Sequence, residues 1–483
     1  MLQGRTRDWL LALVLVYGVG ILLVMGIRLM HMHPDEQLAY FFTRRDLPFL
    51  WWYLGAQDTH PPLWFSSFYI MRHLFGDSEF VARFYSVLLS FITLSLVYQL
   101  GRRWFGAARY GWFALAALGV NAFFLYYALE MRPYALIMLL ATASMWLFQR
   151  WLARRTWRAA VYYGVAVAAM LYVHYFLTVL IMAQALYLMV AWWLLPAAGA
   201  RPQPPRDRLL RLAGQGVLAA GVALLLWLPW LPSAFNQVAN LRRVETLGGN
   251  QRGIVGAGTT TVPTSLQAVV DLAQTATNGF APLYVVILLV GAFFLWRRAN
   301  FWLALVWAVG APALSLLINT VAAIYTPRYV VYMVVGLCVL VGAALAVLPI
   351  GRLRWLLLAA FMALNLLAVP GQFPNRTPYR DLFQRVTAAA QPGDVIFFDQ
   401  SSADTRFVQW QTRHYLRGGL RRNRVLTVEE ALEHKRVWFV TDDWFNPQVR
   451  ENFDRIEATH PLQQVYGDCT SDWCYLIQLL EAP

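Results

Sequence analysis

The sequence predicts an integral membrane all-α domain of about eleven transmembrane helices, followed by a small C-terminal α/β domain. Composition and regularly spaced apolar runs predict the membrane part, and a change of pattern after residue 370 predicts the second domain. Of the 483 residues, 59% are hydrophobic and 14% are charged, and the mean hydropathy is +0.46. A water-soluble protein of this length could not bury so much apolar surface.

Apolar runs of about 15 to 21 residues recur along the first 370 residues, and this is the length that crosses a bilayer. The runs begin near Trp9, Val81, Gly111, Pro133, Ala159, Tyr175, Leu212, Pro282, Phe301, Tyr329 and Trp355. The first run, Trp9 to Met30, lacks a small-residue cleavage site, so we expect it to remain as a membrane anchor.

The arginines predict how these spans are oriented. With the N-terminus in the cytoplasm, seventeen arginines fall in the cytoplasmic loops and about eight in the opposite short loops, in agreement with the positive-inside rule. The net charge of +14 is spread in short clusters between apolar runs, which favours anionic lipid headgroups over nucleic acid as partners. We therefore expect a multi-pass plasma-membrane protein whose C-terminal domain is extracytoplasmic.

Two of the outer segments have a recognisable character. In the loop from about His31 to Glu79, Pro34 and Pro61 are expected to open two interfacial helices, the second with Leu63, Trp64 and Phe68 facing the membrane. In the tail, short β-rich runs alternate with helical stretches, which is typical of a small α/β domain. These runs are Val395–Phe398, Val437–Thr441 and Tyr475–Leu479, with a helical stretch at Thr427–Glu433. The predicted domains are therefore residues 1–370 and 371–483.

The three cysteines predict neither a disulfide scaffold nor a zinc site. Cys338 lies inside an apolar run, and Cys469 and Cys474 are left as a local pair whose bonding stays open.

Polar and ionisable residues gather at the predicted outer ends of the spans, where such groups usually face a cavity. They are Asp35, Glu36, Asp58, His60, Glu130, Arg132, His174, Tyr175, Tyr325 and Arg328. His60 precedes Pro61 and Pro62, and a helix opened by proline leaves free N–H groups that favour an anion such as a phosphate.

Each of these residues also has a purely structural explanation. Acidic residues can complement a helix dipole, an ion pair can hold a turn, a lone histidine can sit satisfied at an interface, and an arginine can reach the membrane surface. These alternatives apply to Asp35 with Glu36, to Glu130 with Arg132, to His60 and His174, and to Arg328. No spacing specifies metal ligands, so we assign no metal site and no certain cofactor, and leave a divalent cation open.

Four motifs resemble those of one glycosyltransferase class. They are His33-Pro34-Asp35-Glu36, His60-Pro61-Pro62-Leu63, Glu130-Met131-Arg132-Pro133-Tyr134 and Pro229-Trp230-Leu231-Pro232. Over roughly Trp9 to Leu348 the chain resembles the GT-C class polyprenyl-phosphate-sugar glycosyltransferases, a superfamily that includes the protein O-mannosyltransferases and the lipid A aminoarabinose transferases. The sequence departs from the latter in having Thr59-His60 where they carry Glu-Lys.

The resemblance implies a GT-C-like fold and a set of roles. Asp35 would be the catalytic carboxylate with Glu36 beside it, and His60, Arg132, Arg328 and Tyr325 would bind the lipid phosphate. The residues left for an acceptor or sugar pocket are Asp58, Glu130, His174 and Tyr175.

The expected reaction is transfer of one sugar, with inversion, from a polyprenyl-phosphate donor to a hydroxyl of a glycan, lipid or protein acceptor at the extracytoplasmic face. No Gly-rich nucleotide-binding loop is present, which agrees with a donor that carries no nucleotide. The alternative is a polyprenyl-lipid transporter, flippase or lipid-binding membrane protein. A transporter would usually show repeated halves and polar groups at the bilayer midplane, and the sequence shows neither.

Overall fold

A computed structural model of the chain describes residues 2–32, 34–194, 206–246, 262–322, 325–373, 379–398, 414–416, 420, 422–441, 444, 446–470 and 473–483. The chain divides into two compact units. The first comprises Met1–Arg28 and Arg45–Pro374, and the second comprises Leu29–Arg44 and Asn375–Pro483. His33, the first residue of one predicted motif, lies outside the described residues.

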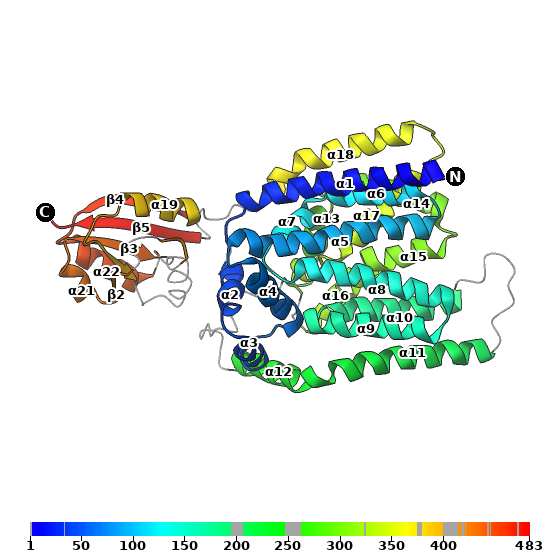
Figure 1. The fold of residues 1–483 in the computed structure, drawn as a ribbon, viewed down its shortest axis with the longest axis horizontal. Helices are drawn as coiled ribbons and strands as arrows, with labels where there is room; N and C mark the ends of the chain where they lie inside the picture. Colours follow the sequence, from blue (N-terminus) through cyan, green and yellow to red (C-terminus); the bar gives the residue numbers. More distant parts are fainter. Residues whose placement is uncertain are drawn as a thin grey trace. The chain divides into compact units, whose positions relative to one another are not determined.

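The first unit is helical. Its helices are α1 (Leu2–Leu29), α3 (Leu47–Ala56), α4 (Pro62–Phe75), α5 (Glu79–Phe105), α6 (Ala108–Gly119), α7 (Ala122–Leu129), α8 (Tyr134–Arg154), α9 (Trp157–Val173), α10 (Leu177–Leu194), α11 (Arg206–Trp227), α12 (Leu231–Thr246), α13 (Leu266–Ala276), α14 (Ala281–Leu295), α15 (Ala299–Leu305), α16 (Ala311–Asn319), α17 (Met333–Val347) and α18 (Leu353–Gln372). Helix α6 packs against both α5 and α17, and α5 also packs against α8 (Figure 1).

Many of these helices have the length and composition of membrane spans. Within the described residues, six helices meet both criteria, two bent helix pairs meet them together, and three further apolar helices are shorter. Each of the predicted apolar runs falls on one of these segments, although the number of membrane crossings stays a prediction. Large apolar side chains point outward, among them Val217, Phe293 and Leu367 at 73%, 75% and 82% exposure, as expected of surfaces solvated by lipid.

Small residues let neighbouring helices approach closely. A side chain at Gly342 of α17 would collide with the backbone of Ala114 in α6, and one at Gly111 of α6 would collide with Tyr98 of α5. Close backbone approach at small residues is the usual way in which membrane helices pack.

The loop between α1 and α5 holds short helices, as predicted, but differs from the prediction in detail. Helix α2 (Pro34–Phe42) begins at Pro34, and α4 begins at Pro62 with Pro61 as its N-cap. The expectation that Trp64 and Phe68 face the membrane is wrong, because both are fully buried and stack on each other with ring centroids 4.8 Å apart. Helix α3 was not predicted.

The second unit contains α2 and a small α/β domain, which confirms the predicted fold of the tail. Its other helices are α19 (Tyr379–Ala389), α21 (Val428–Leu432) and α22 (Pro447–Glu457), and its strands are β1 (Val395–Phe398), β2 (Arg424–Val425), β3 (Arg436–Thr441), β4 (Leu462–Thr470) and β5 (Trp473–Glu481). The sheet order is β2-β1-β3-β5-β4. Strand β1 is parallel to β2 and β3, whereas β5 is antiparallel to β3 and β4.

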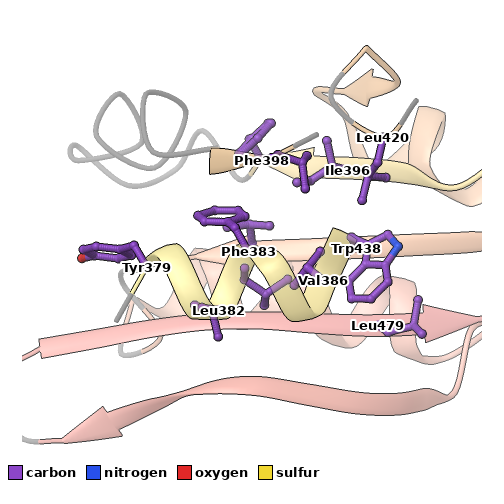
Figure 2. Packing of buried hydrophobic residues seen from close by; sticks show 12 residues of the cluster. Tyr379, Leu382, Phe383, Val386, Ile396, Phe398, Leu420, Trp438 and Leu479 are labelled. Carbon is purple, nitrogen blue, oxygen red and sulfur yellow. The ribbon is translucent and has the colours of Figure 1, made fainter. Parts of the chain in front are cut away.

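The sheet is buried on both faces because successive side chains of a strand point in opposite directions. On one face, Ile396 and Phe398 pack with Phe383 and Val386 of α19, as Figure 2 shows. The alternate residues of β1 and β3 pack on the other face against residues of α21 and α22. Cys469 and Cys474 are directly opposite in the β4–β5 register, so the backbone pairing suits the predicted local pair.

A buried ion pair anchors β1 to β3. Asp394 is 1% exposed, and its carboxylate accepts hydrogen bonds from Arg436 Nε (2.9 Å), Trp438 Nε1 (2.7 Å) and Gln391 N (3.0 Å). Removing one partner of such a pair leaves the other charge buried without compensation.

Asp394→Ala is therefore expected to destabilise the tail by about 3 to 5 kcal/mol. Limited proteolysis of the full-length protein should show faster cleavage within residues 379–483. The matched control is Glu429→Ala, which removes an ion pair with Arg455 that lies on the surface and should leave the cleavage rate unchanged. Equal cleavage rates for the parent and Asp394→Ala would contradict a stabilising role for this pair.

Candidate functional site

Four turns of the first unit bring the predicted site residues together. Asp58 and His60 lie between α3 and α4, Glu130 and Arg132 between α7 and α8, His174 between α9 and α10, and Arg328 in a short turn before α17. These turns are far apart in sequence, and the contacts described below connect them.

The centre of the site is a chain of three side chains. Asp58 Oδ1 lies 2.6 Å from His60 Nδ1, and His60 Nε2 lies 3.1 Å from Arg132 Nη2. The same Asp58 oxygen accepts hydrogen bonds from the backbone N–H groups of Thr59 (2.6 Å) and His60 (2.9 Å). The loop residue Asp58 therefore fixes both the backbone and the ring of His60.

These contacts fix the orientation of the His60 ring. A guanidinium can only donate hydrogen bonds, so His60 Nε2 must accept from Arg132, and the proton of a neutral ring is then on Nδ1, facing Asp58. Burial acts to raise the pKa of Asp58, but its contacts with His60, followed by the nearby Arg132, hold that pKa below the usual value. Asp58 is thus a carboxylate at neutral pH, and the His60 ring connects it to Arg132 through hydrogen bonds.

His174 and Arg328 lie beside the Asp58, His60 and Arg132 side chains. The His174 ring lies 6.2 Å from the His60 ring and 4.8 Å from the Tyr329 ring, measured between centroids, and the Arg328 guanidinium lies 5.7 Å from the Tyr329 ring centre. Burial, followed by the charges of His60, Arg132 and Arg328, lowers the pKa of His174 well below its usual value. His174 is therefore neutral at neutral pH, and the fixed positive charges of the site are the two arginines.

The Glu130–Arg132 turn is buried, and hydrogen bonds from α5 fix its backbone. Glu130 and Arg132 are 6% and 5% exposed. The backbone oxygens of Leu129 and Glu130 accept hydrogen bonds from Arg83 Nη1 (3.0 Å) and Ser86 Oγ (2.7 Å) of α5. Arg132, Arg328 and Glu130 all lie within electrostatic range of Tyr134, so the structure brings the two arginines and Glu130 to one place.

Tyr175 is connected through Gln237 to the backbone of the loop that carries His60. Its hydroxyl donates to Gln237 Oε1 (2.6 Å) and accepts from Trp230 Nε1 (2.9 Å), and Gln237 Nε2 donates to the backbone oxygens of Leu54 (2.7 Å) and His60 (3.3 Å). The sequence analysis missed Gln237. Trp230 belongs to the Pro229–Pro232 motif, which was the only signal pointing to this region.

Tyr325 has different neighbours. Its backbone N–H donates to Asn319 Oδ1 (2.7 Å), and its backbone oxygen accepts from Val262 N–H (2.9 Å). Burial, followed by the charge of Asp271, raises the pKa of Tyr325 to about 12. The contacts described for Tyr325 connect it to these residues and not to His60 or Arg132, so its role toward the phosphate stays a prediction.

Asp35 and Glu36 belong to the second unit. They lie in the first turn of α2, where Asp35 is half-buried and Glu36 is fully buried. Further along α2, Tyr40 and Phe41 contact the ring of His414, with centroids 5.0 and 6.4 Å apart. Because these two acidic residues are in a different unit from His60 and Arg132, their catalytic role stays a prediction.

A metal site does not emerge from the part of the chain that the structure describes. Within those residues, no three His, Cys, Asp or Glu side chains are grouped as metal ligands. The question of a divalent cation is therefore still open.

The chain resembles known proteins both in part of its sequence and in its fold. Residues 59–198, which include His60, Arg132 and His174, match the family model of dolichyl-phosphate-mannose-protein mannosyltransferases. ArnT from Cupriavidus metallidurans bound to undecaprenyl phosphate has a similar fold, with a TM-score of 0.60 and 15% identity over 97% of each chain. No curated protein matches the chain by sequence.

The oligosaccharyltransferase of Archaeoglobus fulgidus in its apo form is also similar, with a TM-score of 0.52 and 13% identity over 96% of this chain and 74% of that one. AglB from Archaeoglobus fulgidus, in complex with an inhibitory peptide and a dolichol-phosphate, gives a TM-score of 0.50 at the same identity and coverage. These likenesses confirm the predicted resemblance to the GT-C class glycosyltransferases, the GT-C-like fold, and a multi-pass membrane protein. The proteins that the chain resembles are glycosyltransferases.

Proposed function

We propose that this protein is a glycosyltransferase that moves a sugar from a polyprenyl-phosphate donor to an acceptor hydroxyl at the extracytoplasmic face of the plasma membrane. The observation that carries the proposal is the hydrogen-bonded series Asp58–His60–Arg132, half-buried at Asp58 and His60 and buried at Arg132, beside Arg328. Its members His60 and Arg132 lie within the 59–198 segment that matches the mannosyltransferase model, in a fold shared with a protein bound to undecaprenyl phosphate.

The two arginines would hold the donor phosphate. A guanidinium presents donors in a planar fork that matches phosphate oxygens, and it keeps its charge at every physiological pH. His60 contacts Arg132 through its Nε2 and would orient the guanidinium toward the phosphate.

Asp35 would act as general base, a role supported by the resemblance of its motif alone. It would take the proton of the acceptor hydroxyl while the acceptor oxygen attacks the anomeric carbon. The bond from that carbon to the phosphate oxygen breaks, the polyprenyl phosphate leaves with both bonding electrons, and the sugar is inverted. Arg132 and Arg328 would stabilise the charge that grows on the departing phosphate.

The location and the acceptor are inferred from two further observations. The arginine asymmetry between loops supports a cytoplasmic N-terminus and an extracytoplasmic site. A glycan, a lipid or a protein would each provide the required hydroxyl. AglB was solved with an inhibitory peptide and a dolichol-phosphate, which supports a fold that holds a lipid phosphate and a peptide together.

The proposal is tested by incubating membranes that contain the protein with a panel of polyprenyl phosphates carrying labelled sugars. Incorporation of label into a membrane or envelope acceptor, above membranes without the protein, is the expected result. Lipid binding without transfer across the panel would contradict the proposal and favour the transporter, flippase or lipid-binding alternative.

Asp58→Asn is expected to raise the donor KM by about 10- to 100-fold, with a smaller change in kcat. The substitution removes the charge behind His60, and a hydrogen bond to a charged group contributes about 1.5 to 3 kcal/mol. Kinetics at varied donor concentration measure the effect. The control is His73→Ala, an exposed histidine of α4 that contacts only Tyr69 among the contacts described for it and should leave KM unchanged.

A further inference from the structure

Two helix breaks face each other in the first unit. Helix α6 ends at Gly119 and α7 begins at Ala122 with a bend of 68°, and α13 ends at Ala276 and α14 begins at Ala281 with a bend of 79°. Each break interrupts the backbone hydrogen bonds of an apolar segment. In a membrane such groups must find partners inside the protein, because an unsatisfied group costs several kcal/mol.

Two asparagines satisfy the breaks reciprocally. Asn121, in the first break, donates to the backbone oxygen of Ala276 at the second (2.8 Å). Asn278, in the second break, accepts from the Ala122 N–H (2.8 Å) and donates to the Val120 oxygen (2.9 Å) at the first. Asn278 has φ +54°, a left-handed conformation that asparagine adopts more readily than most residues.

A third asparagine joins the pair to another helix. Asn365 of α18 accepts hydrogen bonds from Asn278 Nδ2 (3.0 Å) and from the Tyr284 hydroxyl (2.9 Å). Asn121, Asn278 and Asn365 are at most 2% exposed. We call these three residues the asparagine bridge.

Helix α7 leads directly from the bridge to the candidate site. It has eight residues, so it is about 12 Å long, and it ends at Leu129, immediately before the Glu130–Arg132 turn. Its far end is held by Arg83 and Ser86 of α5. The position of Arg132 relative to His60 therefore depends on a short helix that is fixed at both ends.

We propose that the asparagine bridge positions the donor-phosphate site by fixing α7 and, through it, Arg132. The inference rests on the proposed function, because it assigns the phosphate to Arg132. A polar bridge is more directional than apolar packing, since each hydrogen bond fixes a distance and an angle. The asparagines are positioning residues, and they act on the donor only through Arg132.

Asn278→Gly tests the proposal, because glycine keeps the left-handed backbone and removes only the bridging amide. A small displacement of a positioning group can cost up to about 100-fold, so we expect the donor KM to rise by about 10- to 100-fold. The acceptor KM should stay within about threefold, because the bridge acts on the phosphate side alone. Asn121→Ser is a second variant with the same expected result, since serine keeps the N-cap bond to the Phe124 N–H and removes the amide that donates to Ala276.

The matched control is Gln215→Leu, which removes a buried hydrogen-bonding amide of α11 whose described partners are Trp151 and Arg155, outside α7 and the asparagine bridge. It is expected to lower the melting temperature without changing the donor KM. If Asn278→Gly lowered the melting temperature while both KM values stayed unchanged, the bridge would be purely structural and the proposal overturned. An inactive parent protein would instead contradict the proposed function.

A double-mutant cycle shows whether the bridge acts through Arg132. In an Arg132→Ala background, Asn278→Gly should weaken binding of undecaprenyl phosphate by less than about twofold, because the positioned group is already absent. In the parent background the same substitution should weaken this binding by about 10-fold or more. Equal effects in the two backgrounds would show that the bridge does not act through Arg132.

Discussion

Asp35→Asn is expected to lower the turnover of sugar transfer by about 10²- to 10⁴-fold while leaving donor binding unchanged, because that is the usual contribution of a general base. Asparagine has nearly the shape of aspartate but cannot take the acceptor proton. The phosphate contacts assigned to Arg132 and Arg328 are untouched by the change. Initial rates with labelled donor, together with equilibrium binding of the same donor, separate the two effects.

The outer loop provides a matched carboxylate as control. Asp46 caps α3 by accepting from the Phe49 N–H (2.8 Å), and asparagine is an equally good cap, so Asp46→Asn removes a charge and keeps the structure. A similar loss in Asp35→Asn and Asp46→Asn would attribute the effect to the charge of the region. An Asp35→Asn protein with the parent rate would rule out Asp35 as the base, and Glu36→Gln would then test its neighbour.

The sequence predicted the helical segments and pointed to turns that the structure brings together, because both depend on local patterns. Apolar runs of sufficient length identify the spans, and the proline-flanked motifs around His60 and Arg132 mark turns where ionisable residues meet. The likeness to ArnT confirms the fold that these motifs predicted. Helix α3 was missed because Leu47–Ala56 is almost wholly apolar and too short for a span, so it shows neither an amphipathic period nor the length of a membrane helix.

The roles of individual side chains were harder to predict because they depend on contacts across the fold. Asp58 was assigned to a sugar or acceptor pocket, yet its carboxylate faces the ring of His60, two residues away. Nothing in the sequence distinguishes Gln237 from other polar residues of its segment, and its importance comes from hydrogen bonds to Leu54 and His60. The asparagine bridge likewise joins residues that are more than 150 positions apart.

Arg132→Ala is expected to lower kcat by about 10²- to 10³-fold and to raise the donor KM. The loss in kcat follows if Arg132 stabilises the charge that develops on the leaving phosphate, since removing one such donor usually has this effect. Steady-state kinetics with labelled donor measure both constants. The control is Arg72→Ala in α4, where a buried arginine pairs with Asp77, so its loss should lower stability without a selective effect on the donor.

Arg132→Lys separates the charge of this residue from its shape. Lysine keeps the positive charge but lacks the planar fork with which arginine can donate to two acceptors at fixed angles. If Arg132 must donate to His60 while it binds the phosphate, lysine should restore part of the donor affinity that is lost in Arg132→Ala. It should restore little of the kcat that is lost in that variant. A lysine variant with full kcat would show that charge alone suffices, and the His60–Arg132 contact would then have no part in catalysis. Little recovery of kcat, combined with a raised donor KM in Asp58→Asn, would show that the site works as one chain from Asp58 to the phosphate.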